Sequence, residues 1–113
     1  MNVQIFGTKK SFDSKKAERY FKERGIKYQF VDMKEKGLSK GEFNSVCQAV
    51  GGYEKLIDPK CKDKNLLALI QYLSEEDKKE KILENQKIIR TPIVRNGKQA
   101  TVGYEPDVWK GWK

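Results

Sequence analysis

The sequence predicts an α/β fold with a four-stranded mixed sheet, and three observations support this fold class. A strand, a helix and a second strand follow one another within residues 1–32, a unit that favours parallel strands joined by a right-handed crossover. Residues 39–86 carry helical patterns. Asn96-Gly97 lies between two late β-forming segments and is typical of a hairpin, whose strands are antiparallel.

The opening β-α-β unit is defined by the spacing of its apolar residues. Residues 3–6 mix apolar and β-forming side chains and stop at Gly7, as a short strand does before a loop. From Ser11 the apolar residues follow a helical period that Gly25 ends, and residues 26–32 then alternate apolar and polar. We expect the inward face of the helix to carry Phe12, Ala17, Tyr20 and Phe21.

The middle of the chain is predicted to be helical. Ser39 and Glu42 have the spacing of a capping box, and Gly51-Gly52 ends the helix that they begin. A short helical turn is expected over residues 53–57, a helix over residues 65–73, and another that begins after Ser74. The first of these helices has an apolar stripe of Phe43, Val46, Cys47 and Val50, and the last turns Ile82 and Leu83 inward.

The last third predicts a hairpin and a short helix. One strand is expected over residues 88–89 and 92–95, the turn at Asn96-Gly97, and the second strand over residues 99–103. Pro106 suits the first position of a helix that places Val108, Trp109 and Trp112 on the sheet. The whole order is that of a thioredoxin-like (glutaredoxin-like) α/β domain with a helical insertion, about 39–86, between its second and third strands.

Composition limits the classes of function. With 113 residues the chain is expected to form one domain, residues 1–113, and no apolar run approaches the length of a membrane span. Two cysteines and no histidine argue against a disulfide scaffold, the usual zinc sites and an imidazole base. No secretory leader is visible, so a cytoplasmic location is expected. The net charge of +8 is spread among glutamates, which indicates a solvated surface rather than direct nucleic-acid binding.

Three segments together resemble the arsenate reductase (ArsC)-like family, which includes the Spx-type regulators. They are GTKKSFDSKKA at residues 7–17, the helical insert, and IIRTPIVRNGKQATVGYEPDVW at residues 88–109. The first is similar to the family's strand-to-helix loop, and the third to its arginine-proline strand, hairpin and glycine-aromatic ending. The resemblance covers nearly the whole chain and implies the thioredoxin-like fold.

The resemblance implies that Ser11 stands where the family has its nucleophilic cysteine, and Ser14 where a Cys-x-x-Cys pair has its second cysteine. A thiol at a helix N-terminus is readily ionised, whereas a serine hydroxyl is not. No histidine is present to activate a serine, so Ser11 is expected to act as a helix cap. The sequence leaves open whether Ser11 is native or a Cys→Ser replacement.

The anion-binding positions of the family also differ. Arsenate reductases carry an arginine directly before a cis-proline, whereas here Thr91 precedes Pro92 and Arg90 stands one residue earlier. On a strand, a shift of one residue turns the side chain to the opposite face of the sheet. Lys60 corresponds to a second family arginine and lacks its bidentate geometry. Pro92 is expected to be cis, the alternative being a trans proline that opens an edge strand. Gly103-Tyr104 is expected to end the last strand beside this site, with Gly103 letting the backbone approach closely. The remaining candidates near Ser11 are the lysines Lys9, Lys10, Lys15 and Lys16.

The two cysteines receive different interpretations. Cys47 lies on an apolar helix stripe and is expected to be a small buried side chain. Cys61 lies between Lys60 and Lys62, where ammonium groups favour a thiolate, and is either a resolving thiol for a sulfur at position 11 or an exposed cysteine without a role.

Two functions of different classes remain. The first is an ArsC-like oxidoreductase linked to glutathione or glutaredoxin and acting on a small oxyanion, inactive with Ser11 in place of the nucleophile; arsenate reduction is not expected. The alternative is a binding module similar to the Spx-type regulators, which contact RNA polymerase, with Gly51-Gly52 as part of the partner surface. No cofactor is expected beyond a thiol co-substrate, and no metal.

Overall fold

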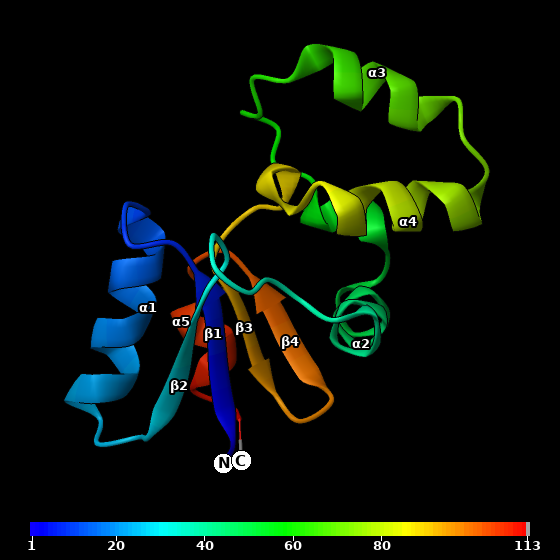
Figure 1. Ribbon diagram of the computed structural model, residues 1–113. Coiled ribbons are helices and arrows are strands. Elements are labelled where there is room, and N and C mark those ends of the chain that lie inside the picture. Colours follow the sequence, from blue (N-terminus) through cyan, green and yellow to red (C-terminus); the bar gives the residue numbers. More distant parts are fainter. Residues whose placement is uncertain (113) are drawn as a thin grey trace.

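The fold is a four-stranded mixed sheet with helices on both faces, and a computed structural model describes residues 1–112 (Figure 1). The strands are β1 (Val3–Gly7), β2 (Tyr28–Asp32), β3 (Ile93–Asn96) and β4 (Gln99–Val102), in the order β2-β1-β3-β4. β1 pairs with β2 in parallel and with β3 antiparallel, and β3 pairs antiparallel with β4. The predicted thioredoxin-like topology is confirmed.

One face of the sheet is covered by α1 (Phe12–Glu23) and α5 (Pro106–Trp109). Their core is aromatic, because the Trp109 ring lies 5.1 Å from the ring centroids of both Tyr20 and Phe21. The indole Nε1 of Trp109 donates to Thr101 Oγ1 at 2.8 Å, which satisfies the one polar atom of this ring. Val108 was predicted to face the sheet and instead is exposed, because it stands on the outer side of this short helix.

The other face is covered by α2 (Lys40–Val50), the first helix of the insert. The rest of the insert consists of η1 (Tyr53–Leu56), α3 (Lys64–Gln71), α4 (Glu75–Glu84) and η2 (Gln86–Ile88). The predicted capping box of α2 is present, with Ser39 as its first residue and Glu42 as its second. Gly51 ends α2 with φ +91°, a left-handed conformation that favours glycine. Figure 1 shows α3 and α4 beyond the end of the sheet at which β1 finishes.

The core under the insert joins sheet residues to helix residues. Phe6 and Ile93 from the sheet pack with Phe43, Val46 and Ile82 from α2 and α4, all of them buried. Cys47 is buried in the same cluster, as predicted, and burial raises the pKa of its thiol. The predicted buried stripe of α2 is therefore confirmed except at its last residue, Val50, which is only half-buried.

The hairpin differs from its prediction by one residue. Asn96 belongs to β3 and pairs with Gln99, so Gly97 and Lys98 form the turn. Gly97 has φ +63° at the first turn position, where a two-residue hairpin turn accepts glycine. The expected strand over residues 88–95 is also shorter: Ile88 ends η2, Ile89 forms an isolated bridge with Ile57, and β3 begins after Pro92.

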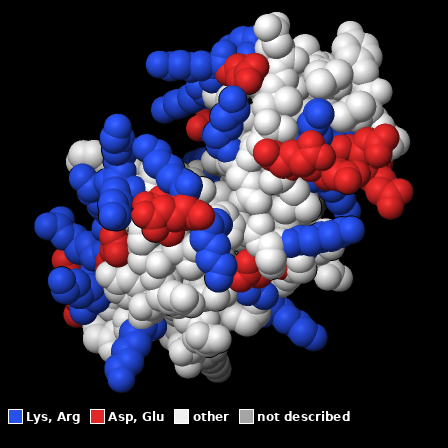
Figure 2. Space-filling model, in the orientation of Figure 1, with Lys and Arg blue, Asp and Glu red and all other residues white. Residues whose placement is uncertain are grey.

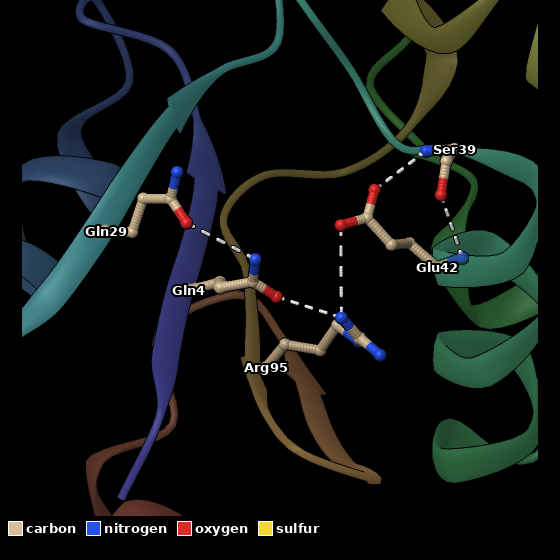
Figure 3. Close-up of polar contacts among 5 residues, drawn as sticks. All are labelled: Gln4, Gln29, Ser39, Glu42 and Arg95. Atoms are coloured by element: carbon tan, nitrogen blue, oxygen red, sulfur yellow. Dashed lines mark hydrogen bonds and ion pairs between the residues drawn. The ribbon is translucent and has the colours of Figure 1, made fainter.

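A row of polar contacts crosses the insert-facing side of the sheet (Figure 3). Gln29 on β2 accepts from Gln4 on β1 at 3.4 Å, and Gln4 accepts from Arg95 Nη1 on β3 at 2.9 Å. Arg95 Nη1 lies 3.9 Å from Glu42 Oε2, whose other oxygen accepts the Ser39 N–H at 2.9 Å. The row therefore ties three strands to the first turn of α2. None of the helices within residues 1–112 is both long enough and apolar enough to span a membrane.

Candidate functional site

The candidate site lies where β1 ends and α1 begins. Ser11 is the N-cap of α1, as predicted, with extended backbone and a side-chain oxygen that accepts the N–H of Ser14 at 3.2 Å. The loop before it is closed by the Ser11 N–H, which donates to the Thr8 carbonyl at 3.2 Å. Ser11 is half-buried, so its hydroxyl stands at the surface of a structured loop.

Ser14 occupies a fully buried position one helical turn further on. Its Oγ accepts the N–H of Thr8 at 3.4 Å, so it bridges the loop to the helix. Gly7 permits this, because a Cβ at position 7 would lie 2.4 Å from Ser14 Oγ. The sequence analysis identified both serines as candidates but did not predict this contact. The signal for it was Gly7, a glycine at the end of an apolar strand.

Pro92 stands at the same end of the sheet. The Thr91–Pro92 peptide bond is cis, as predicted, and the alternative of a trans proline on an edge strand is wrong because β3 is a central strand. Since Phe6 pairs with Ile93 and Ile93 with Val102, Pro92 and Gly103 follow at the end of the sheet where Gly7 lies. Gly103 donates its N–H to the Pro92 carbonyl at 2.8 Å.

Arg90 is placed against Gly103. Gly103 has φ +82°, and a Cβ there would lie 2.9 Å from a guanidinium nitrogen of Arg90. The glycine therefore allows the close approach that the sequence predicted, but toward Arg90. Arg90 itself is exposed, and its backbone N–H donates to the Leu56 carbonyl at 2.7 Å.

The loop carrying Lys60 and Cys61 runs beside the segment that leads to Pro92. Asp58 donates its N–H to the Ile88 carbonyl at 2.8 Å, next to the Ile57–Ile89 bridge. The Asp58 carboxylate accepts the Lys60 N–H at 2.9 Å and leaves the exposed lysine side chain outward. Cys61 is half-buried and packs against the insert-side core, so it is not the exposed cysteine of the second interpretation.

An exposed aromatic side chain next to Ser11 departs from the prediction. Phe12 was expected on the inward face of α1 and is 77% exposed, because the first turn of the helix extends past the end of β1 (Figure 1). The Lys16 ammonium lies 5.6 Å from the Phe12 ring centroid and 5.5 Å from that of Tyr104. These contacts bring Tyr104, which the sequence places beside the site together with Gly103, to the edge of the site.

The site is electropositive. None of the four lysines around Ser11 pairs with an acidic side chain of residues 1–112: Lys9, Lys10, Lys15 and Lys16. Figure 2 shows basic side chains over the α1 side of the molecule and acidic ones gathered over α4. A helix N-terminus among unpaired ammonium groups is suited to a small anion. In the described part of the chain no three His, Cys, Asp or Glu residues meet as a metal site would require.

A cis-proline at the end of the sheet where α1 begins, on a sheet of this order, defines a thioredoxin-like protein. Residues 6–112 match the ArsC family, and the chain belongs to that family. The comparison with curated proteins gives no match.

Solved structures show the same fold over nearly the whole chain. The arsenate reductase from Vibrio cholerae is 25% identical, with a TM-score of 0.82 and coverage of 96% of this chain and 94% of that one. A Bacteroides fragilis protein described as related to the ArsC family is 19% identical, with a TM-score of 0.86 and coverage of 100% and 98%. An arsenate reductase (ArsC) related protein from Brucella melitensis is 22% identical, with a TM-score of 0.62 and coverage of 99% and 94%.

Proposed function

We propose that this chain is a reductase-type member of the ArsC family in which Ser11 occupies the position of the nucleophilic cysteine, so that it does no thiol chemistry in this form. The observation that carries the proposal is the Ser11 oxygen at the cap of α1, at the end of the sheet that holds cis-Pro92. The similarity to an arsenate reductase structure and the family match support the reductase class.

The geometry explains why one atom decides the activity. A sulfur at position 11 would receive the N–H that Ser14 now gives to the hydroxyl, together with the positive end of a 12-residue helix. Such an environment lowers a cysteine pKa from about 8.5 into the range of about 3.5–7.5 and produces a thiolate nucleophile. A serine hydroxyl gains no comparable ionisation, and the sequence holds no histidine to act as its base.

The basic side chains complete the proposed site. Lys10, Lys60 and Arg90 are all exposed, and Arg90 is held against Gly103 beside Pro92. We propose that they attract a small oxyanion or the carboxylates of glutathione, and that glutathione or a glutaredoxin is the thiol co-substrate of a cysteine-containing form. Thr91 occupies the position at which arsenate reductases carry the arginine, and Arg90 stands one residue earlier. For this reason arsenate itself is not proposed as the substrate.

Installing the missing sulfur tests the proposal. We expect Ser11→Cys, made together with Cys61→Ser, to have a thiol pKa at least about 1 unit below 8.5. Its thiolate is expected to attack oxidised glutathione, forming a mixed disulfide and releasing reduced glutathione, and glutaredoxin then reduces that mixed disulfide. The pKa is measured from the pH dependence of alkylation. Cys47 does not interfere, because burial raises the pKa of its thiol.

Ser74→Cys, in the same Cys61→Ser background, is the matched control. Ser74 also caps a helix, but Glu75, Glu76 and Asp77 surround it in the first turn of α4. The control thiol is expected to be less acidic than Cys at position 11, because the carboxylates oppose the helix dipole. An unperturbed, unreactive thiol at position 11 would contradict the proposed site.

The alternative, a regulator that contacts RNA polymerase, stays a prediction. Gly51 and Gly52 both donate N–H groups to the Cys47 carbonyl and both have positive φ, which accounts for the two glycines as a helix end. The redox-type function is therefore the one that the site supports best.

A further inference from the structure

One face of α3 is exposed within residues 1–112 and is apolar except for one asparagine at its start. Its members are spaced as one helical stripe and all are exposed: Asn65, Ala68, Leu69 and Tyr72. Leu69 is 47% exposed and Tyr72 is 87% exposed. We call these four residues the α3 face.

The opposite side of α3 holds the helix in place. Ile70 is 3% exposed, and with Leu67 it lines a cavity of about 290 Å³ whose other walls include Tyr53 and Ile57. The N-cap Asp63 accepts the Leu66 N–H at 3.1 Å and forms an ion pair with Lys87 at 3.4 Å. The exposure of Leu69 and Tyr72 therefore belongs to a well-anchored helix with two apolar sides.

The two ends of the α3 face carry opposite charge. Three exposed lysines lie in and before its first turn: Lys60, Lys62 and Lys64. Three exposed carboxylates follow its last turn, at the start of α4: Glu75, Glu76 and Asp77. Glu75 pairs with Lys78 at 3.8 Å and accepts from the Tyr53 hydroxyl at 3.3 Å, whereas Glu76 and Asp77 form no ion pair among residues 1–112. Figure 2 shows acidic side chains gathered over α4.

We propose that the α3 face binds a second copy of this chain, with the two α3 helices antiparallel about a two-fold axis. In that arrangement the lysine end of each copy meets the carboxylate end of the other, and symmetry makes both contacts alike. Leu69 and Tyr72 of the two copies pack together at the centre. A parallel arrangement would place like charges together at both ends, which is why the antiparallel pairing is the one proposed.

The size of the α3 face sets the strength of this dimer. An eight-residue helix is about 12 Å long, so the pair buries less than the roughly 800 Å² per partner of a standard stable interface. The association is therefore weak and concentration-dependent. Because the flanking charges are exposed, it weakens as salt screens them.

Analytical ultracentrifugation of the full chain tests the apolar contact. We expect a monomer-dimer equilibrium with a dissociation constant between about 10 µM and about 1 mM. Leu69→Ser or Tyr72→Ser is expected to raise this dissociation constant by about tenfold or more. Phe12→Ser is the matched control, since Phe12 is 77% exposed on α1 rather than on α3 and is expected to leave the equilibrium unchanged. All three positions are exposed, so circular dichroism is expected to show intact folds.

Charge reversal tests the antiparallel arrangement. One variant carries Lys62→Glu and Lys64→Glu, and the other carries Glu76→Lys and Asp77→Lys. Each variant alone is expected to self-associate about tenfold more weakly than the parent, because the two ends of its α3 face then carry charge of the same sign. An equimolar mixture of the two variants is expected to recover dimers, because the ends of one are negative and those of the other positive.

Three results would overturn the proposal: a chain that stays monomeric at every concentration, a dimer that survives Leu69→Ser and Tyr72→Ser, or a mixture that associates no better than its components. Capture of RNA polymerase by a monomeric chain, lost in the Tyr72→Ser variant, would equally overturn it, because the face would then serve a different partner.

Discussion

At the scale of single residues, the contact between Gly7 and Ser14 fixes the loop that presents Ser11. A methyl group at position 7 would lie 2.4 Å from Ser14 Oγ and 2.9 Å from Ser14 Cβ, and Ser14 is fully buried. We expect Gly7→Ala to lower the free energy of unfolding by about 1–3 kcal/mol through overpacking. Urea denaturation measures this.

Gly41→Ala is the control for that substitution. Gly41 lies in α2 with nothing within 4 Å of an added Cβ, so alanine there is expected to raise stability by about 0.4–1 kcal/mol. Equal effects of the two substitutions would show that the Ser14 contact is unimportant.

The residue scale also shows how far the site could be predicted. The cap at Ser11 was predictable because capping depends on a few neighbouring residues. The exposure of Phe12 was not, because helical spacing alone does not reveal that the sheet ends before the first turn of α1. Tyr104 was expected beside the site with Gly103, but its contact with Lys16, 88 residues away in the chain, was not predictable from local spacing.

At the scale of elements, Glu42 joins α2 to the sheet. One of its oxygens accepts the Ser39 N–H, and the other lies 3.9 Å from Arg95 (Figure 3). We expect Glu42→Ala to cost about 1–2 kcal/mol of unfolding free energy, and Glu42→Gln less, because glutamine can still accept the capping hydrogen bond. Glu76→Gln, in the first turn of α4 without an ion pair among residues 1–112, is expected to stay within about 0.5 kcal/mol.

Element boundaries were predictable except where a side chain or a proline changed the backbone pairing. Asn96 was expected in the turn, but its side chain accepts the Asn2 N–H and donates to Gln99, so it is held in β3 and the turn moves by one residue. Residues 88–89 have the apolar character of a strand. Pro92 lacks an N–H for the ladder, however, and β3 begins only after it.

At the scale of the whole molecule, the titrating groups predict a stability that falls in alkali. Burial raises the pKa of the Cys47 thiol and those of the Tyr28 and Tyr53 hydroxyls above their ordinary values, and Glu18 adds to the effect at Tyr28. As pH rises, the unfolded chain therefore loses these protons before the folded chain does. The melting temperature is expected to fall above about pH 9 and to show no histidine step between about pH 6 and 8, since histidine is absent.

Thermal melts across this pH range check the expectation. Cys47→Ala removes the thiol with the lowest ordinary pKa of the three, so the alkaline loss is expected to begin at higher pH in that variant. A melting temperature that rises with pH above about 9 would contradict the assignment of these three groups.

The insert leaves and rejoins the sheet at one end. β2 runs parallel to β1 and finishes at Asp32, while β3 runs antiparallel to β1 and starts at Ile93, so both junctions lie within about two strand spacings, or roughly 10 Å. The insert therefore begins and ends at neighbouring points of the sheet, with no strand of the sheet between them in the sequence. A chimera could graft the corresponding helices of another family member between these junctions without altering a single strand register, provided that the graft supplies apolar partners for Phe6 and Ile93.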